Sequence, residues 1–312
     1  MDKISFIVPC YNEGESVKPL YDEIINSFKR LKVKLEIIYI NDGSKDDTNY
    51  QIKKLMKDND NIIYINFSRN FGKEAAMYAG LKNATGDYIT IIDADLQQHP
   101  DVVKQMYKIL KKNKNIDCVA TYQKKRKEKL LKKFFSKGFY WFANKLVDIN
   151  MADSASDFRL FKTEVKDALI SFTEHKRFTK GIFSWVGFNV EYLEYEPLDR
   201  KFGTSKWKLK SLFSYAFDGI LSYSEKLLSI PLKLGIFNIF ISIGLFVLAI
   251  LNKIDYIYGI ITLISSINFI VLGLIAIYIS RIYVEVQDRP IFIAKEIIYS
   301  KEKNKNEKVS KK

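Results

Sequence analysis

Cysteine and histidine are scarce in this sequence, and their scarcity excludes several kinds of protein. The 312 residues include only two cysteines, Cys10 and Cys118, so no disulfide framework is implied and a reducing compartment fits. The two histidines, His99 and His175, are not spaced as a pair of metal ligands. No signal peptide is expected, because the chain enters a strand-like run at Ile4.

Negative charge is in deficit: 36 Asp and Glu stand against 50 Lys and Arg, a formal net charge of +14. A basic balance predicts a polyanionic partner, either nucleic acid or an anionic membrane. No nucleic-acid-binding motif occurs, so no nucleic-acid partner is expected. The most basic run, residues 124–133, has three interpretations: a solvated surface helix, a nucleic-acid patch or a membrane-facing patch. We favour the membrane-facing patch, because two charge-free stretches follow.

Charge is absent from two stretches near the C-terminus, residues 234–251 and 257–280. At 1.5 Å per residue the first would span about 27 Å, close to the ~30 Å thickness of bilayer hydrocarbon. The short linker between them predicts a transmembrane helical hairpin; a pair of buried core helices is the alternative. Lysine and arginine flank the hairpin on both sides, which places both of its ends in the cytoplasm. We expect a multi-pass protein of the cell (cytoplasmic) membrane, embedded in the bilayer.

The first 120 residues alternate strand-like and helix-like segments. Short runs rich in β-branched and aromatic residues predict strands at residues 4–8, 35–40, 62–67 and 88–92. Helical periodicity predicts helices at residues 16–28, 48–56 and 74–81. This alternation favours an α/β fold, in which a parallel sheet is covered by helices on both faces. After about residue 120 the strand pattern weakens, and helix-like and loop-like sequence is expected, including residues 156–160.

The expected organisation follows from these patterns. An amphipathic stretch with apolar residues among Lys, Ser and Glu predicts a helix lying along the membrane interface, just before the hairpin. The five parts are a cytoplasmic α/β domain (1–208), the interface helix (209–230), two transmembrane helices (234–251 and 257–280) and a cytoplasmic C-terminal segment with a basic tail (281–312).

Polar clusters follow three of the predicted strands, where open α/β sheets bind their ligands. They are Cys10-Tyr11-Asn12-Glu13, Asn41-Asp42-Gly43-Ser44 and Asp93-Ala94-Asp95. Two carboxylates spaced as Asp93 and Asp95 can share one Mg²⁺ or Mn²⁺, a hard cation that also bridges to phosphate oxygens. Alone the pair is a weak signal, since a solvated turn looks the same. The neighbouring clusters favour the metal interpretation.

The other clusters also have two interpretations each. Asp42 can accept hydrogen bonds from a base or ribose, or belong to a simple Asn-Asp-Gly turn. Asn12 and Glu13 can do the same, or cap the helix that follows. Residues 68–73 place two cations near a glycine, which suits phosphate, or form an ordinary loop. His99, beside Pro100, is expected to begin a helix.

Taken together, these motifs resemble the family 2 glycosyltransferases of the GT-A fold. Within that family the chain is most similar to the polyprenyl-phosphate (bactoprenol) glucosyltransferases and, more distantly, to the dolichol-phosphate mannose synthases. The resemblance runs over roughly residues 3–295 and rests on an ordered set of motifs. These are the three clusters above, Ser68 to Ala75, Leu96-Gln97, Ser156 to Leu160 and Arg200 to Lys206.

The resemblance implies roles for individual residues. The nucleotide-sugar, first of all UDP-glucose, would contact Pro9, Tyr11, Asn12, Glu13, Asp42, Lys73, Asp93, Ala94 and Asp95. The metal ligands would be Asp93, Asp95 and Gln97. The phosphate of a polyprenyl lipid, as the acceptor, would meet Arg200, Ser205 and Lys206. The implied catalytic residues are Asp157, Asp95, Arg200 and Lys206. A homo-oligomer is implied as well, with a tetramer as one arrangement.

Physical chemistry limits the role of Asp157, which occupies the family's position for a catalytic carboxylate. A phosphate monoester has a second pKa near ~6 and is already mostly dianionic at neutral pH. The acceptor therefore needs no base, and Asp157 is free to position the site instead. The larger contributions are expected from proximity and from neutralising the departing diphosphate.

Three rival functions remain to be distinguished. A processive polysaccharide synthase would carry a Gln-x-x-Arg-Trp element, which does not occur here. A transferase for a soluble acceptor would not need the cationic interface, and a non-catalytic lipid-handling relative should lack the intact pair Asp93 and Asp95. The sugar is not readable: N-acetylhexosamine, galactose, mannose and a modified arabinose stay open beside glucose.

Overall fold

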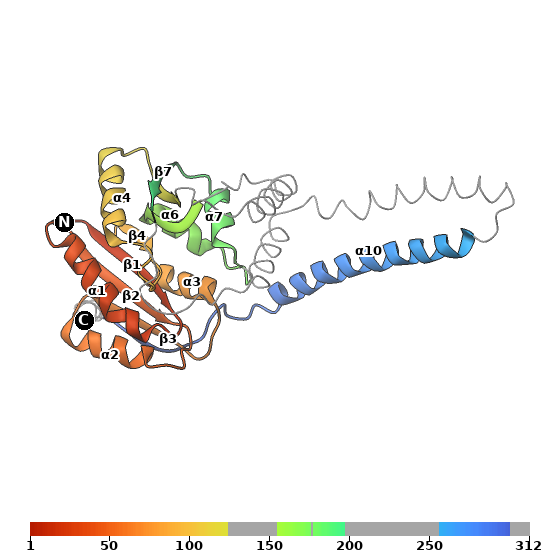
Figure 1. The fold of residues 1–312 in the computed structure, drawn as a ribbon, viewed down its shortest axis with the longest axis horizontal. Helices are drawn as coiled ribbons and strands as arrows, with labels where there is room; N and C mark the ends of the chain where they lie inside the picture. The colour runs from red at the N-terminus through yellow and green to blue at the C-terminus, as the bar shows by residue number, and fades with distance from the viewer. Residues whose placement is uncertain (124–154, 176, 197–255, 300–312) are drawn as a thin grey trace, which may run out of the picture.

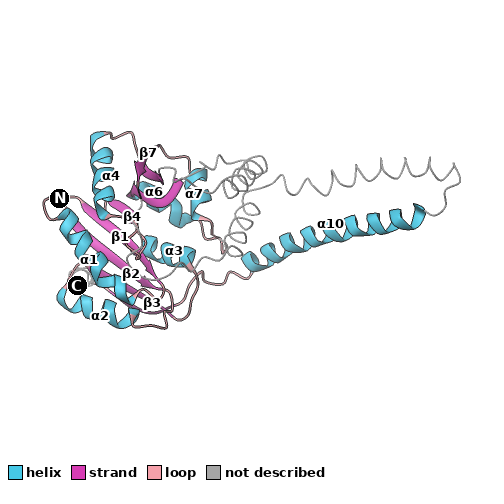
Figure 2. Cartoon of the chain, viewed as in Figure 1, coloured by secondary structure: helices cyan, strands magenta, loops and turns pink. Residues whose placement is uncertain are grey.

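A computed structural model describes residues 1–123, 155–175, 177–196 and 256–299. Its centre is one eight-stranded sheet with the strand order β7-β5-β6-β4-β1-β2-β3-β8 (Figures 1 and 2). The strands are β1 (Lys3–Cys10), β2 (Lys34–Asn41), β3 (Ile62–Phe67), β4 (Tyr88–Ile91), β5 (Cys118–Gln123), β6 (Ala155–Lys162), β7 (Val190–Tyr195) and β8 (Ala294–Ile298). The helices are α1 (Gly14–Phe28), α2 (Thr48–Asp58), α3 (Lys73–Asn83), α4 (Pro100–Lys112), α6 (Thr163–Ser171), α7 (Thr179–Trp185) and α10 (Tyr256–Val286).

The four strands expected from the sequence are present and parallel. Strand β1 pairs in parallel with β2 on one side and β4 on the other, and β2 pairs in parallel with β3. The whole sheet is mixed, because β6 runs antiparallel to β4 and β5, and β8 antiparallel to β3, and neither of these strands was expected. The parallel part still aligns the carboxyl ends of β1 to β4 along one edge, where the polar clusters lie.

Helices cover both faces of the sheet, as the alternation of strands and helices predicts. Along β1, Phe6 and Val8 belong to a core packed by α1, α2 and α4, while Ile7 belongs to a second core packed by α3, α6 and α7. Adjacent strand residues point to opposite faces, so the apolar residues among Ile4 to Val8 fill both cores at once.

Residues 156–160 form a strand rather than the expected helix-like or loop-like sequence. They lie in β6, between β4 and β5, and Phe158 and Leu160 are fully buried. Residues 157–160 alternate polar and apolar, which is the period-2 pattern of a strand, but the alternation is only four residues long and is a weak signal.

Helix α10 extends away from the α/β domain as an arm (Figure 1). Within the described ranges, no helix has the length and apolar character needed to cross a membrane. The second expected transmembrane helix, 257–280, falls inside α10, while the first, 234–251, and the interface helix, 209–230, lie outside the described residues.

After α10 the chain returns to the sheet and adds β8 beside β3. Phe292 stacks on Phe67 with ring centroids 4.9 Å apart, and the Ile293 carbonyl accepts a hydrogen bond from the Ser68 amide at 3.0 Å. Lys53 Nζ lies 2.6 Å from Glu296 Oε2. Part of the C-terminal segment therefore completes the edge of the sheet.

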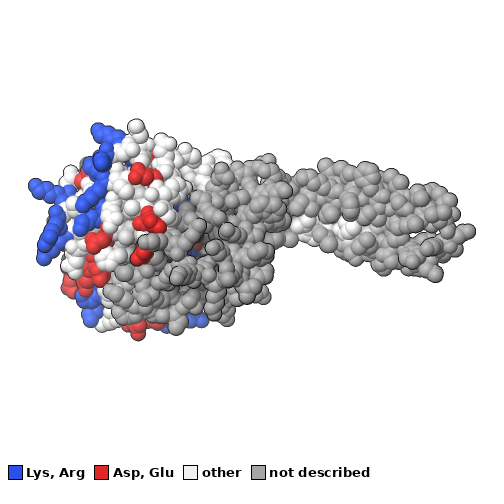
Figure 3. Space-filling model, turned by 45° about the horizontal axis from the view of Figure 1, so that its top comes forward, with Lys and Arg blue, Asp and Glu red and all other residues white. Residues whose placement is uncertain are grey.

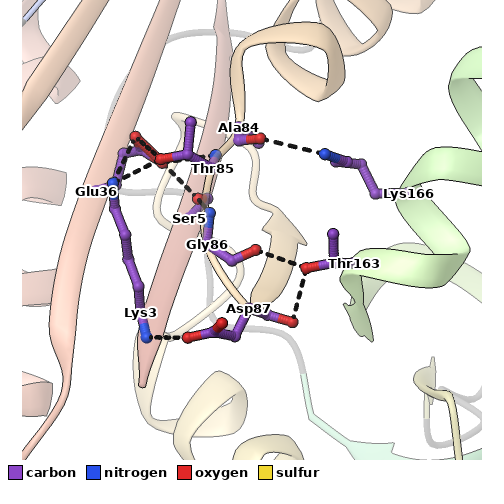
Figure 4. Close-up of polar contacts among 9 residues, drawn as sticks. All are labelled: Lys3, Ser5, Glu36, Ala84, Thr85, Gly86, Asp87, Thr163 and Lys166. Carbon is purple, nitrogen blue, oxygen red and sulfur yellow. Dashed lines mark hydrogen bonds and ion pairs between the residues drawn. The ribbon is translucent and has the colours of Figure 1, made fainter. Parts of the chain in front are cut away.

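A buried carboxylate connects the chain near the amino ends of β1, β2 and β4, at the opposite end of these strands from the polar clusters (Figure 4). Glu36 is 4% exposed and accepts hydrogen bonds from Ser5 Oγ at 2.7 Å, the Thr85 amide at 2.9 Å and Lys3 Nζ at 3.0 Å. Burial alone would raise the pKa of Glu36, but these donors and the Lys3 charge outweigh burial and lower it. The Ser5 hydroxyl in turn accepts from the Gly86 amide at 2.9 Å.

Charge is unevenly spread on the face shown in Figure 3. Lys and Arg side chains gather at the end of the domain farthest from α10, and acidic side chains lie nearer its middle. The basic run 124–133 and the basic tail lie outside the described residues, so the membrane-facing interpretation of that run stays a prediction.

Candidate active site

Asp42, at the carboxyl end of β2, holds the loop between β3 and α3. Its two carboxylate oxygens accept hydrogen bonds from the Phe71 amide at 2.6 Å and the Gly72 amide at 3.0 Å. The residue is 3% exposed, and burial raises its pKa more than these donors and nearby Arg69 lower it. Asp42 is therefore more than a simple turn residue, because it fixes residues 68–72 against the end of β2.

Gly43, in the loop after β2, lets that loop approach the loop after β3 closely. Its φ of +66° is in the left-handed region, and a Cβ there would lie 2.5 Å from the carbonyl carbon of Arg69 and 2.6 Å from the amide nitrogen of Asn70. Only glycine fits this contact, since both neighbouring atoms belong to the backbone.

The turn after β1 is tied to the turn after β2. Asn12, at φ +52°, donates its amide to Ser44 Oγ at 2.9 Å, and its Oδ1 accepts from the Lys45 amide at 2.8 Å. The Glu13 amide donates to Thr48 Oγ1 at 2.8 Å. These contacts join two of the predicted clusters into one structure. Pro9 and Tyr11 flank the same turn and are half-buried.

Asp93 and Asp95 follow β4 in a tight turn. Leu96 adopts a φ of +62°, and Asp95 Oδ1 accepts from the Gln97 amide at 3.1 Å. Ala94 and Asp95 are buried, whereas the Asp93 side chain is 35% exposed. A residue that sequence reasoning missed supports Asp93: Gln98 accepts from its amide at 2.9 Å and contacts its carboxylate at 3.4 Å. The sequence offered no signal that would separate Gln98 from its neighbour Gln97.

Lys73, the first residue of α3, links two strands of the site. Its ammonium lies 2.6 Å from Asp93 Oδ1 and 3.9 Å from Asp157 Oδ2. Burial alone would lower the pKa of Lys73, but the two carboxylates outweigh it and raise the pKa, so the side chain stays charged. The sequence predicted Lys73 and both aspartates as site residues, and the structure brings all three together.

Asp157 lies in an irregular part of β6. Pairing advances by two residues on β5, from Ala120 to Tyr122, but by four on β6, from Arg159 to Ala155. Such a bulge redirects side chains, and bulges are frequent beside active sites. The Thr121 hydroxyl fixes it by donating to the Phe158 carbonyl at 2.9 Å.

A second lysine also faces Asp157. Lys180 of α7 places Nζ 4.0 Å from Asp157 Oδ1, on the carboxylate oxygen that Lys73 does not contact. Glu74 positions α7 by accepting hydrogen bonds from the amide and hydroxyl of Thr179, the residue before Lys180. The sequence does not reveal this contact, because Lys180 lies on a helix far from any recognised motif.

The aspartates fit a hard divalent cation in chemistry and number of ligands. Among the described residues, no group of three or more His, Cys, Asp or Glu forms a closed metal site. Mg²⁺ commonly binds through one or two carboxylates and takes its remaining ligands from water and substrate phosphates. Asp93 and Asp95 supply such a pair; Gln97 is half-exposed, and its role as a ligand stays a prediction.

Two further predictions have different outcomes. His99 does begin a helix: its Nδ1 accepts a hydrogen bond from the Asp101 amide at 3.1 Å, at the start of α4. Arg200, Ser205 and Lys206 lie outside the described residues, so their roles stay predictions. The described site thus joins carboxylates and lysines beside the carboxyl ends of the parallel strands, where open α/β sheets bind their ligands.

Comparison with known proteins identifies the family. Residues 5–169 match glycosyl transferase family 2, which is more than half of the chain. The chain belongs to this family, and its α/β sheet is of the GT-A type, with antiparallel strands added to a parallel centre. The protein is therefore a glycosyltransferase.

Named relatives extend along nearly the whole chain. CsbB of Bacillus subtilis is 39% identical over 303 residues, covering 94% of this chain and 91% of the relative. The SfII prophage-derived bactoprenol glucosyl transferase of Shigella flexneri is 35% identical over 305 residues, covering 94% of this chain and 98% of the relative. Among solved structures, glucosyl-3-phosphoglycerate synthase from Mycobacterium tuberculosis shows 19% identity and a TM-score of 0.49, covering 73% of this chain and 78% of that one. That structural likeness adds nothing to the family assignment.

Proposed function

We propose that this enzyme transfers a hexose to a polyprenyl phosphate. Glucose from UDP-glucose is the preferred candidate. Relatives named bactoprenol glucosyl transferase, aligned over nearly their whole length, support the acceptor. The observation that carries the proposal is the contact of Lys73 with both Asp93 and Asp157, which gathers charge at the sheet edge where a diphosphate would leave.

The reaction is a single displacement with inversion. A phosphate oxygen of the lipid attacks C1 of the sugar, the bond from C1 to the diphosphate oxygen breaks, and the nucleoside diphosphate leaves with the electron pair. Mg²⁺ or Mn²⁺ at Asp93 and Asp95 would supply charge neutralisation for that leaving group. Lys73 is placed to add a second positive charge, and Asp42 to hold the loop beside the nucleotide.

Asp157 acts in this scheme by holding two ammonium groups rather than by removing a proton. The acceptor phosphate is mostly dianionic at neutral pH and already nucleophilic. Asp157 lies within 4.0 Å of both Lys73 and Lys180, so its charge orients cations around the reacting groups. Replacing it with Asn should lower turnover by misplacing these lysines, with the fold retained.

The same proposal places the enzyme at the cytoplasmic membrane. The support is in the sequence: the charge-free stretches 234–251 and 257–280 with their flanking lysines and arginines. A lipid acceptor also requires an enzyme that works at a bilayer surface. Alkaline carbonate extraction of expressing cells tests this part, and release of the full-length chain into the soluble fraction would contradict it.

The test of the reaction is a two-phase transfer assay. Membranes containing the chain receive polyprenyl phosphate, Mg²⁺ or Mn²⁺, and one labelled nucleotide-sugar at a time from a panel that includes UDP-glucose, UDP-N-acetylglucosamine, UDP-galactose and GDP-mannose. Label in the organic phase supports the proposal, and the sugar that gives it identifies the donor. Label confined to aqueous polymer would instead indicate a processive synthase.

A further inference from the structure

We propose that Lys180 binds the phosphate of the acceptor, so that Asp157 separates a donor-side lysine, Lys73, from an acceptor-side lysine, Lys180. This inference rests on the proposed function, because it assigns the phosphate of the acceptor lipid to a particular side chain. No motif or relative's name points to Lys180; the structure places it at the site.

The first support is the order of charges. Asp93, Lys73, Asp157 and Lys180 follow one another, with contacts of 2.6 Å, 3.9 Å and 4.0 Å between successive charged groups. Asp93 stands at the end where the metal and the leaving diphosphate belong. Lys180 stands at the other end of this row, beyond the carboxylate, where a second phosphate group can approach without displacing Lys73.

The second support is the capacity of Lys180 to donate. The 4.0 Å between Lys180 Nζ and Asp157 Oδ1 makes an ion pair but is too long for a hydrogen bond. Asp157 therefore accepts a hydrogen bond from none of the three N–H groups of the Lys180 ammonium. The side chain is 39% exposed, which leaves it open to a ligand while Asp157 holds its direction. A lysine ammonium group binds phosphate as a compact point charge.

The third support is the rigidity of the backbone that carries Lys180. Ile182 and Phe183 are buried in the core shared by α3, α6 and α7. Glu74 fastens Thr179 to the first turn of α3, next to Lys73. The two lysines are therefore carried by helices tied directly to each other, and their positions around Asp157 are set together.

A purely structural role explains Lys180 less well. An ion pair this exposed contributes little to stability, so the pair is not needed to hold α7. The buried side chains and the Glu74 contact already do that. Lys180→Met is accordingly expected to fold, and its defect should be confined to phosphate binding.

The experiment compares the wild type with Lys180→Met, Lys180→Arg and the control Lys18→Met. Lys18 forms an exposed pair with Asp22 on α1, which packs on the opposite face of the sheet. In the two-phase assay, Lys180→Met should raise the KM for polyprenyl phosphate about tenfold, leave the KM for the nucleotide-sugar within about twofold, and be partly rescued by Lys180→Arg. A rise in the nucleotide-sugar KM instead would assign Lys180 to the donor diphosphate and overturn the inference, as would no change in either KM.

A binding measurement separates this inference from the proposed reaction. Isothermal titration with a short, water-soluble prenyl phosphate, in the presence of UDP and Mn²⁺, reports acceptor binding without turnover. Weakening of about tenfold in Lys180→Met, with Lys18→Met unchanged, supports the inference even if the donor sugar has been misidentified. Equal affinity in the wild type and Lys180→Met, or no binding to either, would overturn it, whereas binding without lipid-linked product in the two-phase assay would overturn the proposed reaction alone.

Discussion

Asp157 and Asp93 come together because β6 runs antiparallel to β4. The last pair of that register joins Ile91 to Arg159, and each aspartate lies two residues beyond it: Asp157 within β6 and Asp93 just after the end of β4. Lys73 then bridges the two carboxylates from the start of α3. Residues separated by 64 positions in the sequence thereby form one charged group at the sheet edge.

Removing the bridging lysine should leave two carboxylates facing each other. Lys73→Met is expected to reduce kcat/KM for sugar transfer about 10- to 100-fold, because a charge-assisted contact worth roughly 1.5–3 kcal/mol is lost. Lys82→Met, at the other end of α3, is the matched control and should retain activity. Turnover of Lys73→Met within twofold of the wild type would remove Lys73 from the site.

Two glycines with similar backbone angles should respond differently to alanine. Gly43 and Gly187 have φ values of +66° and +71°, but only at Gly43 would a Cβ meet backbone atoms, at 2.5 Å. Gly187→Ala should cost about 1–2 kcal/mol of stability from backbone strain alone. Gly43→Ala should cost more and weaken UDP binding, since it displaces the loop held by Asp42. Denaturant titration and UDP calorimetry measure the two effects; equal losses in both variants would contradict the close contact.

Gln98 should prove necessary for the conformation of the acidic turn. Gln98→Leu leaves the Asp93 amide unpaired and should destabilise the fold by about 1–3 kcal/mol. Gln98→Glu keeps an acceptor for that amide but adds a negative charge near the Asp93 carboxylate, so it should preserve more stability and still lose turnover. The comparison needs denaturant midpoints and initial rates for both variants; identical behaviour would show that Gln98 does not position Asp93.

The buried network around Glu36 predicts how stability depends on pH. The folded-state pKa of Glu36 is lowered from its ordinary value of 4.5, so its contribution is full above that value and is lost as pH falls through the folded pKa. Glu36→Gln should therefore lose stability at pH 7, and its stability should fall less steeply than that of the wild type below about pH 4.5. Urea denaturation at pH 7, 5, 4 and 3 measures both slopes, and parallel curves would exclude this linkage.

The sequence predicts the first half of the fold well, because hydrophobic pattern and strand position agree there. The strand expected at 62–67 is β3, and the helix expected at 74–81 lies within α3. Strand β6 escapes prediction because its polar and apolar residues alternate over only four positions, 157–160, and β8 because its partner β3 is more than 200 residues away. Local periodicity carries no information about such pairing.

The site divides in a similar way. Asp42, Asp93 and Asp95 can be proposed from the sequence because they lie in the polar clusters that follow apolar strands. Gln98 and Lys180 are not found, because their roles depend on a turn with positive φ at Leu96 and on the tie between Glu74 and Thr179. Both features exist only once the chain has folded.

The most direct test of the account compares lipid-linked product in the wild type, Asp95→Asn and Asp101→Asn. Asp95 belongs to the proposed metal pair, whereas Asp101 is an exposed carboxylate at the start of the neighbouring helix α4. With labelled UDP-glucose, polyprenyl phosphate and Mn²⁺, we expect organic-phase label in the wild type and Asp101→Asn, abolished by EDTA and by Asp95→Asn. Organic-phase label that persists in a folded Asp95→Asn variant would contradict it.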